Sequence, residues 1–462
     1  MLGDTIAAIS TPRGKGGVAL LRVSGMDAIA ITSRVFKPKN GRSLDEVAPR
    51  QAIYGAILAP DGTGAWQTVD DGIATVFVAP FSFTGEDTVE ITCHGGTLLT
   101  ETVLTALLTA GARPAEAGEF TRRAFLNGKL GLSAAEALGN ALEAQTKEQL
   151  TLAHAGMRGK LQQKCESLYG MIRDVLASIY VKIDYPDEDL ADLSRDEILS
   201  HLNSCAAQLR ELSESYRTGH AIAEGIATVI CGKPNVGKSS LYNRIVGRDA
   251  AIVTDVEGTT RDVLTETASL GRVTLRLFDT AGLRETLDPV EKIGIRRAED
   301  AMRDAELILA VFDGSAAPDA EDLRFIEQLK DASASVIAIL NKCDRGANYE
   351  DFYRTHFENA VVLSAKSGEG FSELIALTER LFINGALNVR EDAVLTNARQ
   401  YAAILSAKAA TERAVHALAS GYPIDMCCID AEDAMSSIAE VDGRAVSEDI
   451  VSQIFSHFCV GK

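Results

Sequence analysis

The stretch that decides the fold is Gly232-Lys233-Pro234-Asn235-Val236-Gly237-Lys238-Ser239, which directly follows the apolar run Ile226–Cys231. It matches the pattern G-x-x-x-x-G-K-[ST], a loop that joins a buried strand to a helix and wraps phosphate groups with backbone N–H donors. We expect Lys238 to reach the β- and γ-phosphates and the Ser239 hydroxyl to bind Mg²⁺. The sequence therefore predicts a nucleotide-binding domain on a doubly wound sheet.

Two motifs further along the chain fit the metal and the γ-phosphate. Asp279-Thr280-Ala281-Gly282 follows the apolar run Val273–Phe278. Its carboxylate can hold the Mg²⁺ shell, and its glycine N–H can sense the γ-phosphate. Gly258-Thr259-Thr260-Arg261-Asp262 lies between this turn and the phosphate loop, where Thr260 is suited to cap Mg²⁺ as a switch residue.

Two later motifs are suited to bind the base of the nucleotide. Asn341-Lys342-Cys343-Asp344 follows the apolar run Val336–Leu340. Its last carboxylate can accept both N–H donors of guanine, which adenine does not present. Ser364-Ala365-Lys366 is similar to the loop that closes over guanine in GTPases. In this order, and at the ends of apolar runs, the motifs indicate a GTPase.

The catalytic group is less evident. Ras-like enzymes place Gln directly after D-x-x-G, but Leu283 stands here and cannot orient water. Glu291, further along the same segment, is a carboxylate that could position water. On residue chemistry alone, an exposed helix charge is the simpler interpretation of Glu291.

The chain divides into segments that differ in their expected secondary structure. Residues 1–127 alternate β-type runs with Gly-rich turns, which is typical of an α+β domain, whereas 128–224 are helical. Residues 225–388 alternate buried strands and helices, and helical texture returns over 389–462. The simplest organisation is a helical domain interrupted by an inserted β/α domain. An independent C-terminal helical domain remains the alternative.

Helix signals mark the helical segments. Apolar residues recur at 3.6-residue spacing from Leu161 to Ile179, and Ser194 with Glu197 forms a capping-box pattern that opens a helix ending at Gly219. Further apolar stripes are expected in two C-terminal helices, the first imperfect because Lys408 falls on the same face. Their members are Tyr401, Ile404, Leu405, Val415 and Leu418, then Ile450, Val451, Ile454, Phe455 and Phe458.

The composition of the chain limits the classes of protein to which it can belong. The 462 residues carry a formal net charge of −19, so the surface as a whole should repel nucleic acid, and any RNA contact needs a local basic patch or a partner protein. No apolar run reaches the roughly 18 residues of a membrane span, and Met1–Ser10 lack signal-peptide features. The eight cysteines show no zinc spacing. These features predict a cytoplasmic protein with reduced thiols.

Together, five segments resemble the MnmE (TrmE) family of tRNA-modification GTPases, one of the TrmE-Era-like K⁺-activated P-loop GTPases, over nearly the whole chain. Those segments are Gly232–Ser240, Thr254–Asp262, Phe83-Thr84-Gly85-Glu86-Asp87, Phe125-Leu126-Asn127-Gly128-Lys129 and Phe458-Cys459-Val460-Gly461-Lys462. The last matches the family's C-[IL]-G-K terminus with Val460 as a conservative change.

The resemblance implies a K⁺-activated GTPase whose G domains dimerise across their nucleotide faces. It assigns Glu291 as the catalytic acid and the K⁺ ligands to Asn235, Thr254, Val256 and Thr259. Mg²⁺ is expected at Ser239 and Thr260. The GTP contacts expected are Asn235, Val236, Gly237, Lys238, Ser239, Ser240, Thr254, Asp255, Val256, Glu257, Gly258, Thr259, Thr260, Asp279, Thr280, Ala281, Gly282, Asn341, Lys342, Asp344, Ser364, Ala365 and Lys366.

The resemblance also implies that the N-terminal domain binds a tetrahydrofolate derivative, as in the glycine-cleavage aminomethyltransferase. The matching positions are Arg22, Glu90, Lys129 and Lys462. Basic groups suit a glutamate tail, and a carboxylate suits the N–H donors of a pterin. Cys459, near the chain end, is a candidate nucleophile or a small apolar residue that closes the last helix.

The family's function is the leading hypothesis. With the FAD-dependent partner MnmG (GidA), in a heterotetramer, a homodimer of this chain would add an aminomethyl or carboxymethylaminomethyl group to C5 of the wobble uridine of certain tRNAs. Methylenetetrahydrofolate would supply the carbon. The acidic charge fits this division, since the partner could supply most of the RNA-binding surface.

Two other classes stay open. An Era-like ribosome-assembly switch predicts a basic RNA-binding module after the G domain, and the acidic residues 421–462 count against it. A stand-alone folate aminomethyltransferase with a regulatory GTPase predicts glycine or ammonia turnover without RNA.

Overall fold

The computed structural model describes residues 3–185, 193–248, 265–278, 302–346, 349–456 and 458–461. The chain forms two compact units: residues up to 139 together with those from 442 onward, and residues 140–441. No helix in the described ranges has the length and apolar character to cross a bilayer.

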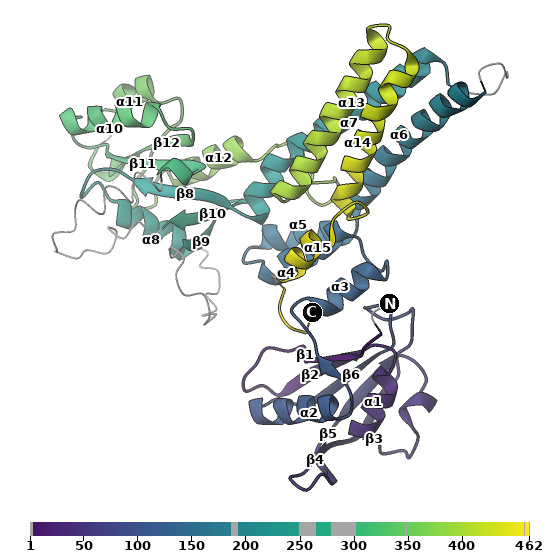
Figure 1. The fold of residues 1–462 in the computed structure, drawn as a ribbon. Helices are drawn as coiled ribbons and strands as arrows, with labels where there is room; N and C mark the ends of the chain where they lie inside the picture. Colours follow the sequence, from purple (N-terminus) through teal and green to yellow (C-terminus); the bar gives the residue numbers. More distant parts are fainter. Residues whose placement is uncertain are drawn as a thin grey trace. The chain divides into compact units, whose positions relative to one another are not determined.

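The N-terminal unit is built on a seven-stranded sheet with the order β3-β4-β5-β6-β2-β1-β7 (Figure 1). Neighbouring strands are antiparallel except for the pair β1 and β7. The strands are β1 (Ile6–Ile9), β2 (Val18–Ser24), β3 (Phe36–Pro38), β4 (Ala52–Pro60), β5 (Trp66–Phe77), β6 (Thr88–His94) and β7 (Arg113–Pro114).

Helices complete this unit. Alternating apolar residues of the strands pack on α1 and α2, which gives the α+β domain expected from the sequence. The end of the chain returns here, because Val451 and Phe455 of α15 pack with Leu132 and Ala135. The helices are α1 (Ala28–Val35), α2 (Thr97–Thr109), α3 (Glu119–Leu126), the first part of α4 (Leu132–Glu143) and α15 (Glu448–Ser456), with the short 3₁₀ turn η1 (Leu44–Glu46).

The second unit contains the doubly wound sheet, with the order β13-β12-β11-β8-β10-β9. All its neighbours are parallel except β9 and β10. The elements are β8 (Ile226–Cys231), β9 (Thr265–Leu270), β10 (Val273–Phe278), β11 (Leu307–Asp313), β12 (Ser335–Asn341) and β13 (Ala360–Val362), with α8 (Lys238–Arg248), α10 (Ala320–Lys330), η2 (Cys343–Arg345), α11 (Glu350–His356) and α12 (Phe371–Phe382).

A helical bundle flanks the inserted sheet in the sequence, and it is one domain. Buried residues of α6, α7, α13 and α14 form a single core, so these four helices run side by side (Figure 1). This core rules out a separate C-terminal domain made of α13 and α14. The helices are α5 (Lys147–Met157), α6 (Lys160–Asp184), α7 (Arg195–Ala223), α13 (Ala398–Ala419) and α14 (Cys428–Asp442), with η3 (Ile424–Cys427).

Two expectations about these helices are wrong. Gly219 does not end α7 but lies inside it, where a Cβ would stand 2.0 Å from the Leu395 carbonyl oxygen. The glycine therefore permits the chain to pass close to the helix. In the stripe expected in α13, Leu405 is exposed, whereas Ile404 and Leu418 are buried and Tyr401 and Val415 are partly buried against the same core. Alanines complete this buried face, including Ala403, Ala407 and Ala410.

The capping box and the α6 stripe are confirmed. Ser194 accepts a hydrogen bond from the N–H of Glu197, whose carboxylate returns to the Ser194 N–H. Every apolar residue expected in the α6 face is buried. Sequence signals thus placed the buried face of α6 and the start of α7 correctly.

The inserted domain leaves and re-enters the bundle at one place. The Thr218 hydroxyl of α7 donates to the Phe382 carbonyl oxygen (3.4 Å) and accepts from the Asn384 N–H (2.8 Å). Five residues after Thr218, α7 ends at Ala223, and β8 begins at Ile226. Both ends of the insertion therefore lie at the last turns of one helix.

Candidate functional site

The phosphate loop connects β8 to α8 and passes close to the ends of β11 and β12. Gly232 and Gly237 have φ angles of +143° and +102°. A Cβ on Gly232 would lie 2.2 Å from the Val311 carbonyl oxygen, and one on Gly237 2.1 Å from the Asn341 amide nitrogen. Only glycine meets both requirements at these positions. Asn235, at φ +61°, is exposed at the tip of the loop.

Lys238 is held by neutral groups. Its Nζ donates to the carbonyl oxygens of Gly232 (2.9 Å) and Lys233 (2.7 Å). Burial lowers the pKa of Lys238, and no described carboxylate forms an ion pair with it. Because its described partners are neutral carbonyl oxygens, no described anion competes with a ligand for this ammonium at the loop. This placement suits contact with phosphate groups.

A second lysine fixes the first half of the loop. Lys233 forms ion pairs with Asp319 (2.7 Å) and Asp322 (2.8 Å) at the start of α10. The sequence analysis missed this anchor, because the two aspartates follow a different strand and carry no motif. The two lysines thus have opposite roles, one neutralised and one available.

Asn341 joins the phosphate loop to the predicted base-binding loop. Its side chain is buried, with Nδ2 donating to the Val236 carbonyl oxygen (2.8 Å) and Oδ1 accepting from the Ala365 N–H (2.9 Å). Asn341 was expected as a GTP contact, whereas the geometry also makes it a structural bridge. The two loops are therefore brought together by one amide.

The predicted base pocket gathers at the carboxyl ends of β12 and β13. Asp344 is exposed in η2, and Lys342, at φ +68°, forms an ion pair with Asp313 (2.7 Å). Arg244 of α8 donates to the carbonyl oxygens of Ala365 (2.6 Å) and Lys366 (2.7 Å), which fixes their loop. Sequence reasoning missed Arg244, since an arginine two turns into a helix gives no signal.

Several expected residues lie outside the described part of the chain. They include Glu291, Leu283, the Asp279–Gly282 turn, the Thr254–Asp262 segment and Lys462. Of the Mg²⁺ and K⁺ positions, Ser239 in α8 and Asn235 are described. Both stand on the glycine-shaped loop beside Lys238, where hydroxyl and amide oxygens suit such cations.

The N-terminal unit brings three expected folate positions into one region of its sheet. Arg22 on β2 and Glu90 on β6 are register partners, and their side chains form an ion pair at 2.8 Å. The guanidinium carbon of Arg22 lies 5.3 Å from the ring centre of Phe83. Lys129 Nζ donates to the Pro80 carbonyl oxygen (2.8 Å), three residues before Phe83.

A buried arginine holds the 83–87 loop in place. Arg123 is 1% exposed and forms ion pairs with Glu86 (3.0 Å), Asp4 (2.8 Å) and Glu119 (2.9 Å). These carboxylates offset the desolvation of the guanidinium, and the net effect raises the pKa of Arg123. Glu86 thereby ties the loop that carries Phe83 to α3.

The chain end is laid against β1. The Ser10 hydroxyl donates to the Gly461 carbonyl oxygen (3.0 Å), and Val460 forms an isolated bridge with Ala117. A Cβ on Gly461, at φ +98°, would lie 2.5 Å from the Ile9 carbonyl oxygen. Ile9 is the register partner of Leu21, the neighbour of Arg22. Lys462 therefore follows a residue fixed one strand away from Arg22.

Cys459 is the exposed thiol among the eight cysteines. Its carbonyl oxygen accepts from the Gly118 N–H at 3.4 Å. Burial raises the pKa of the Cys93 and Cys427 thiols to about 11, so those groups stay protonated at neutral pH. Accessibility distinguishes Cys459 as the better candidate for reaction.

Comparisons with known proteins cover both units. A family model described as "MnmE helical domain" matches residues 132–459, and one described as "GTP-binding protein TrmE N-terminus" matches residues 5–129. The chain is 41% identical over 462 residues to a protein of Symbiobacterium thermophilum named "tRNA modification GTPase MnmE", with 99% of each chain covered. Identically named proteins of Lactobacillus delbrueckii subsp. bulgaricus and Carboxydothermus hydrogenoformans are 40% and 39% identical, covering 99% and 100% of this chain and 98% and 100% of their own.

Proposed function

Because this chain belongs to the MnmE family of tRNA modification GTPases, we propose that it is the K⁺-activated GTPase of a wobble-uridine modification. As a member of that family it hydrolyses GTP and acts in tRNA modification. The proposal adds the chemistry: a C1 unit from methylenetetrahydrofolate is transferred to C5 of uridine, with an FAD-dependent MnmG partner.

The observation that carries the GTPase part is the Asn341 bridge. It places the phosphate loop, with Lys238, and the 364–366 loop on either side of one buried amide. Lys238 then neutralises the β- and γ-phosphates, while the Asp344 carboxylate accepts the two N–H donors of guanine. A triphosphate that reaches both loops is selected by charge at one end and by base at the other.

The Mg²⁺ residues are assigned by residue chemistry, whereas the K⁺ ligands and the group that positions the attacking water are assigned by the family resemblance. The Ser239 hydroxyl, with Thr260, would hold Mg²⁺, and the Asn235 side chain, with Thr254, Val256 and Thr259, would hold K⁺. When bound, these cations would neutralise the charge that develops on the phosphates. Glu291 is proposed to position the water, as the family resemblance implies, since Leu283 has neither donor nor acceptor for that role.

The folate part of the proposal is supported by the chain end. Gly461 is fixed against β1, one strand from the Arg22–Glu90 pair, so Lys462 can join these groups from the far end of the sequence. Arg22 and the two lysines suit the carboxylates of a glutamate tail, and Glu90 suits pterin N–H groups. Cys459 lies in the same segment and is proposed to take part in the transfer.

The quaternary arrangement is proposed from the family resemblance: a homodimer with two MnmG subunits as the working complex. The net charge of −19 is consistent with it, because the partner could supply the basic surface that holds tRNA. A cytoplasmic location belongs to the same proposal.

Nucleoside mass spectrometry of tRNA tests the reaction. A deletion strain should lose the aminomethyl-type wobble uridines, and the wild-type gene should restore them. The gene for Asn235→Ala should restore them poorly, whereas that for Asn203→Ala, an exposed asparagine of α7, should restore them fully. Unchanged wobble uridines in the deletion strain would remove the proposal while leaving the GTPase identity intact.

A kinetic measurement tests the cation separately. GTP hydrolysis should be faster in K⁺ than in Na⁺ of equal ionic strength, and Asn235→Ala should abolish this dependence with GDP binding retained. Equal rates in both salts for the unmodified chain would contradict K⁺ activation.

A further inference from the structure

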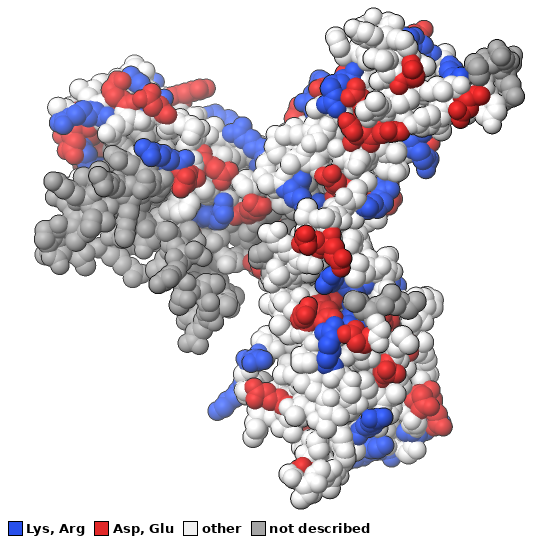
Figure 2. All heavy atoms as spheres, in the orientation of Figure 1, with Lys and Arg blue, Asp and Glu red and all other residues white. Residues whose placement is uncertain are grey.

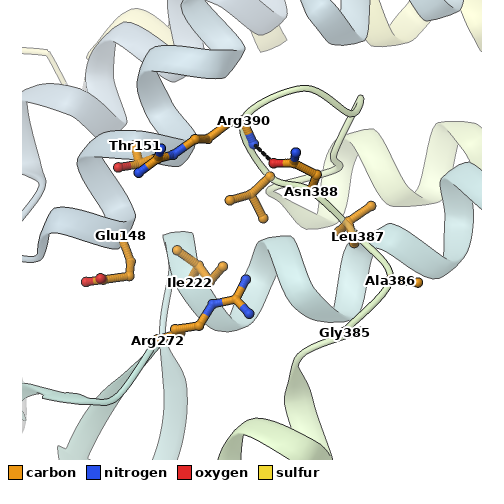
Figure 3. Close-up of a pocket in the computed structure, with 10 residues that line it drawn as sticks. Glu148, Thr151, Ile222, Arg272, Gly385, Ala386, Leu387, Asn388 and Arg390 are labelled. Atoms are coloured by element: carbon orange, nitrogen blue, oxygen red, sulfur yellow. Dashed lines mark hydrogen bonds between the residues drawn. The ribbon is translucent and has the colours of Figure 1, made fainter.

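A pocket of about 430 Å³ lies in the second unit, away from the phosphate loop (Figure 3). It is bounded by α5, by the end of α7, by the β9–β10 turn and by residues 385–390, which follow α12. Its volume falls within the roughly 300–1,000 Å³ of small-molecule sites, and one side is open to solvent. Of the described residues assigned to GTP, Mg²⁺, K⁺ or folate, none lines it.

Two arginines give the pocket its charge. Arg272 and Arg390 use their backbone N–H groups, which donate to Glu379 (2.8 Å) and Asn388 (3.2 Å). Neither guanidinium forms an ion pair or hydrogen bond with a described residue. The Arg390 side chain extends towards Thr151 of α5 (Figure 3).

Among the described lining residues, Glu148 is the single carboxylate. Lys160, by contrast with the two arginines, pairs with Glu391 (3.6 Å), the residue after Arg390. Acidic and basic side chains are interspersed over the described surface in Figure 2, on a chain of net charge −19. An excess of unpaired guanidinium groups in a concave site is therefore a local feature that favours an anion.

The pocket also has an apolar side. Ile222 is buried at its floor, and Leu387 and Val389 are partly buried against the core of the inserted domain. Such a wall accepts a flat ring, while the fork of an arginine suits phosphate oxygens in two-point contact. Glu148 can accept N–H donors from the ring. A ligand with a phosphate and a nitrogenous base satisfies all three features.

We propose that this pocket binds a nucleoside phosphate, as a second nucleotide site separate from the phosphate loop. The source is either a free nucleotide or an unpaired nucleotide of an RNA strand, for which the open side leaves a path. The site goes beyond the proposed function, because it requires neither folate nor wobble-uridine chemistry.

The test uses the full chain with GDP in excess, so that the phosphate-loop site is filled. Uridine 5′-monophosphate and a fluorescently labelled hexauridylate serve as probes, since neither contains guanine. Both affinities are measured by titration at several salt concentrations. Replacing two phosphate contacts in Arg272→Ala/Arg390→Ala should weaken binding at least about tenfold and lower the salt slope for the RNA by about one to two units.

Matched variants separate charge from folding. Arg324→Ala, an exposed arginine of α10, should leave both affinities unchanged. Arg272→Lys/Arg390→Lys should lose less than the alanine pair, because charge is kept and the planar fork is lost. GDP affinity of each variant checks that the inserted domain is folded.

The results with the two probes test the proposal and identify the source of the nucleotide. Binding of the mononucleotide alone identifies a free nucleotide as ligand, and binding of hexauridylate alone identifies RNA. No binding of either probe up to about 1 mM, or binding that the double alanine variant leaves unchanged, would overturn the proposal. Loss of wobble modification in a deletion strain is a separate result and does not bear on this site.

Discussion

The phosphate loop and the proposed folate region are assembled in opposite ways. In the former, eight consecutive residues supply the loop, and strand ends nearby supply the rest. In the latter, Arg22, Glu90, Lys129 and Gly461 come from four distant parts of the chain. The phosphate-binding part of the first site is thus encoded in one short segment, whereas the second region draws every member from a different part of the N-terminal unit.

The positively charged side chains of the two regions also differ in how they are paired. Lys238 is held by carbonyl oxygens and keeps its charge, whereas Arg22 is already paired with Glu90. A lone cation favours a highly charged ligand such as a triphosphate. A cation–carboxylate pair offers donors and acceptors together, and so favours a ligand with both acidic and N–H groups. The electrostatics of each region match the ligand proposed for it.

The largest expected effect comes from the nucleotide region. Glu291→Ala should lower kcat for GTP by about 10²-fold or more, the scale of losing a well-placed orienting group. GTP affinity should barely change, because Lys238 and Asp344 remain. Single-turnover hydrolysis and nucleotide titration measure the two quantities.

Folate binding should be unaffected by the same change if the two regions are independent. Glu321→Ala, an exposed acid of α10, is the control. Normal hydrolysis by Glu291→Ala in saturating K⁺ would show that another group orients the water.

The second-largest effect tests whether the nucleotide site depends on contacts outside the phosphate-loop motif. Asn341→Ala removes both hydrogen bonds between the phosphate loop and the 364–366 loop. At about 1 kcal/mol each, their loss should weaken GDP binding about 10- to 30-fold. Asn203→Ala is the control, and wild-type GDP affinity in Asn341→Ala would refute the bridging role.

A smaller effect is expected where the remote pieces meet. Gly461→Ala should displace the chain end from Ile9 and weaken binding of 5-formyltetrahydrofolate up to about tenfold, the scale of one charged contact. Gly64→Ala also has a positive φ, +86°, but has open space around it, so it should bind the folate normally. GTP hydrolysis should be unchanged in both. Equal folate affinity of the two variants would show that the chain end does not contribute to folate binding.

The smallest effect concerns the joint between the inserted domain and α7. His220 of α7 lies 3.0 Å from Glu306, which directly precedes β11, and 3.2 Å from Glu224. Glu224 and Glu306 raise the pKa of His220 from 6.5 to about 9. The ion pairs therefore stabilise the folded chain fully below about pH 6.5, and this contribution is lost as pH rises through about 9.

Thermal unfolding checks this sign. The melting temperature of His220→Gln should fall several degrees below wild type at pH 6, and the difference should shrink towards pH 10. His201→Gln, an exposed histidine of the same helix, is the control. A difference that grows with pH would exclude protonated His220 as the stabilising form.

Much of the fold could be predicted from local signals. Strands Ile226–Cys231 and Val273–Phe278 have the expected bounds, because buried parallel strands are short apolar runs between polar loops. The α6 stripe is equally plain, since leucine and isoleucine define its buried face. The phosphate loop and Asn341 could be found because each is fixed by its place after a strand.

What the sequence did not reveal depends on contacts between distant segments. Gly219 looked like a helix end, but its role is the approach of Leu395, which lies 176 residues later in the chain. The alanines of the α13 face were not expected, because alanine carries a weak hydrophobic signal while the packing of α7 selects it. Arg244 and Lys233 are anchors whose partners, Ala365 and Asp319, cannot be inferred from spacing.

The Thr218 contact has a consequence for how such a chain can arise. Since Thr218 touches both Phe382 and Asn384, the gap left by removing the intervening domain would be short, and a few residues could close it with little loss of chain entropy. Insertions between neighbouring ends are tolerated because the host fold is not strained. A bundle of this kind can therefore acquire or lose a complete GTPase in one genetic event, without passing through a broken intermediate.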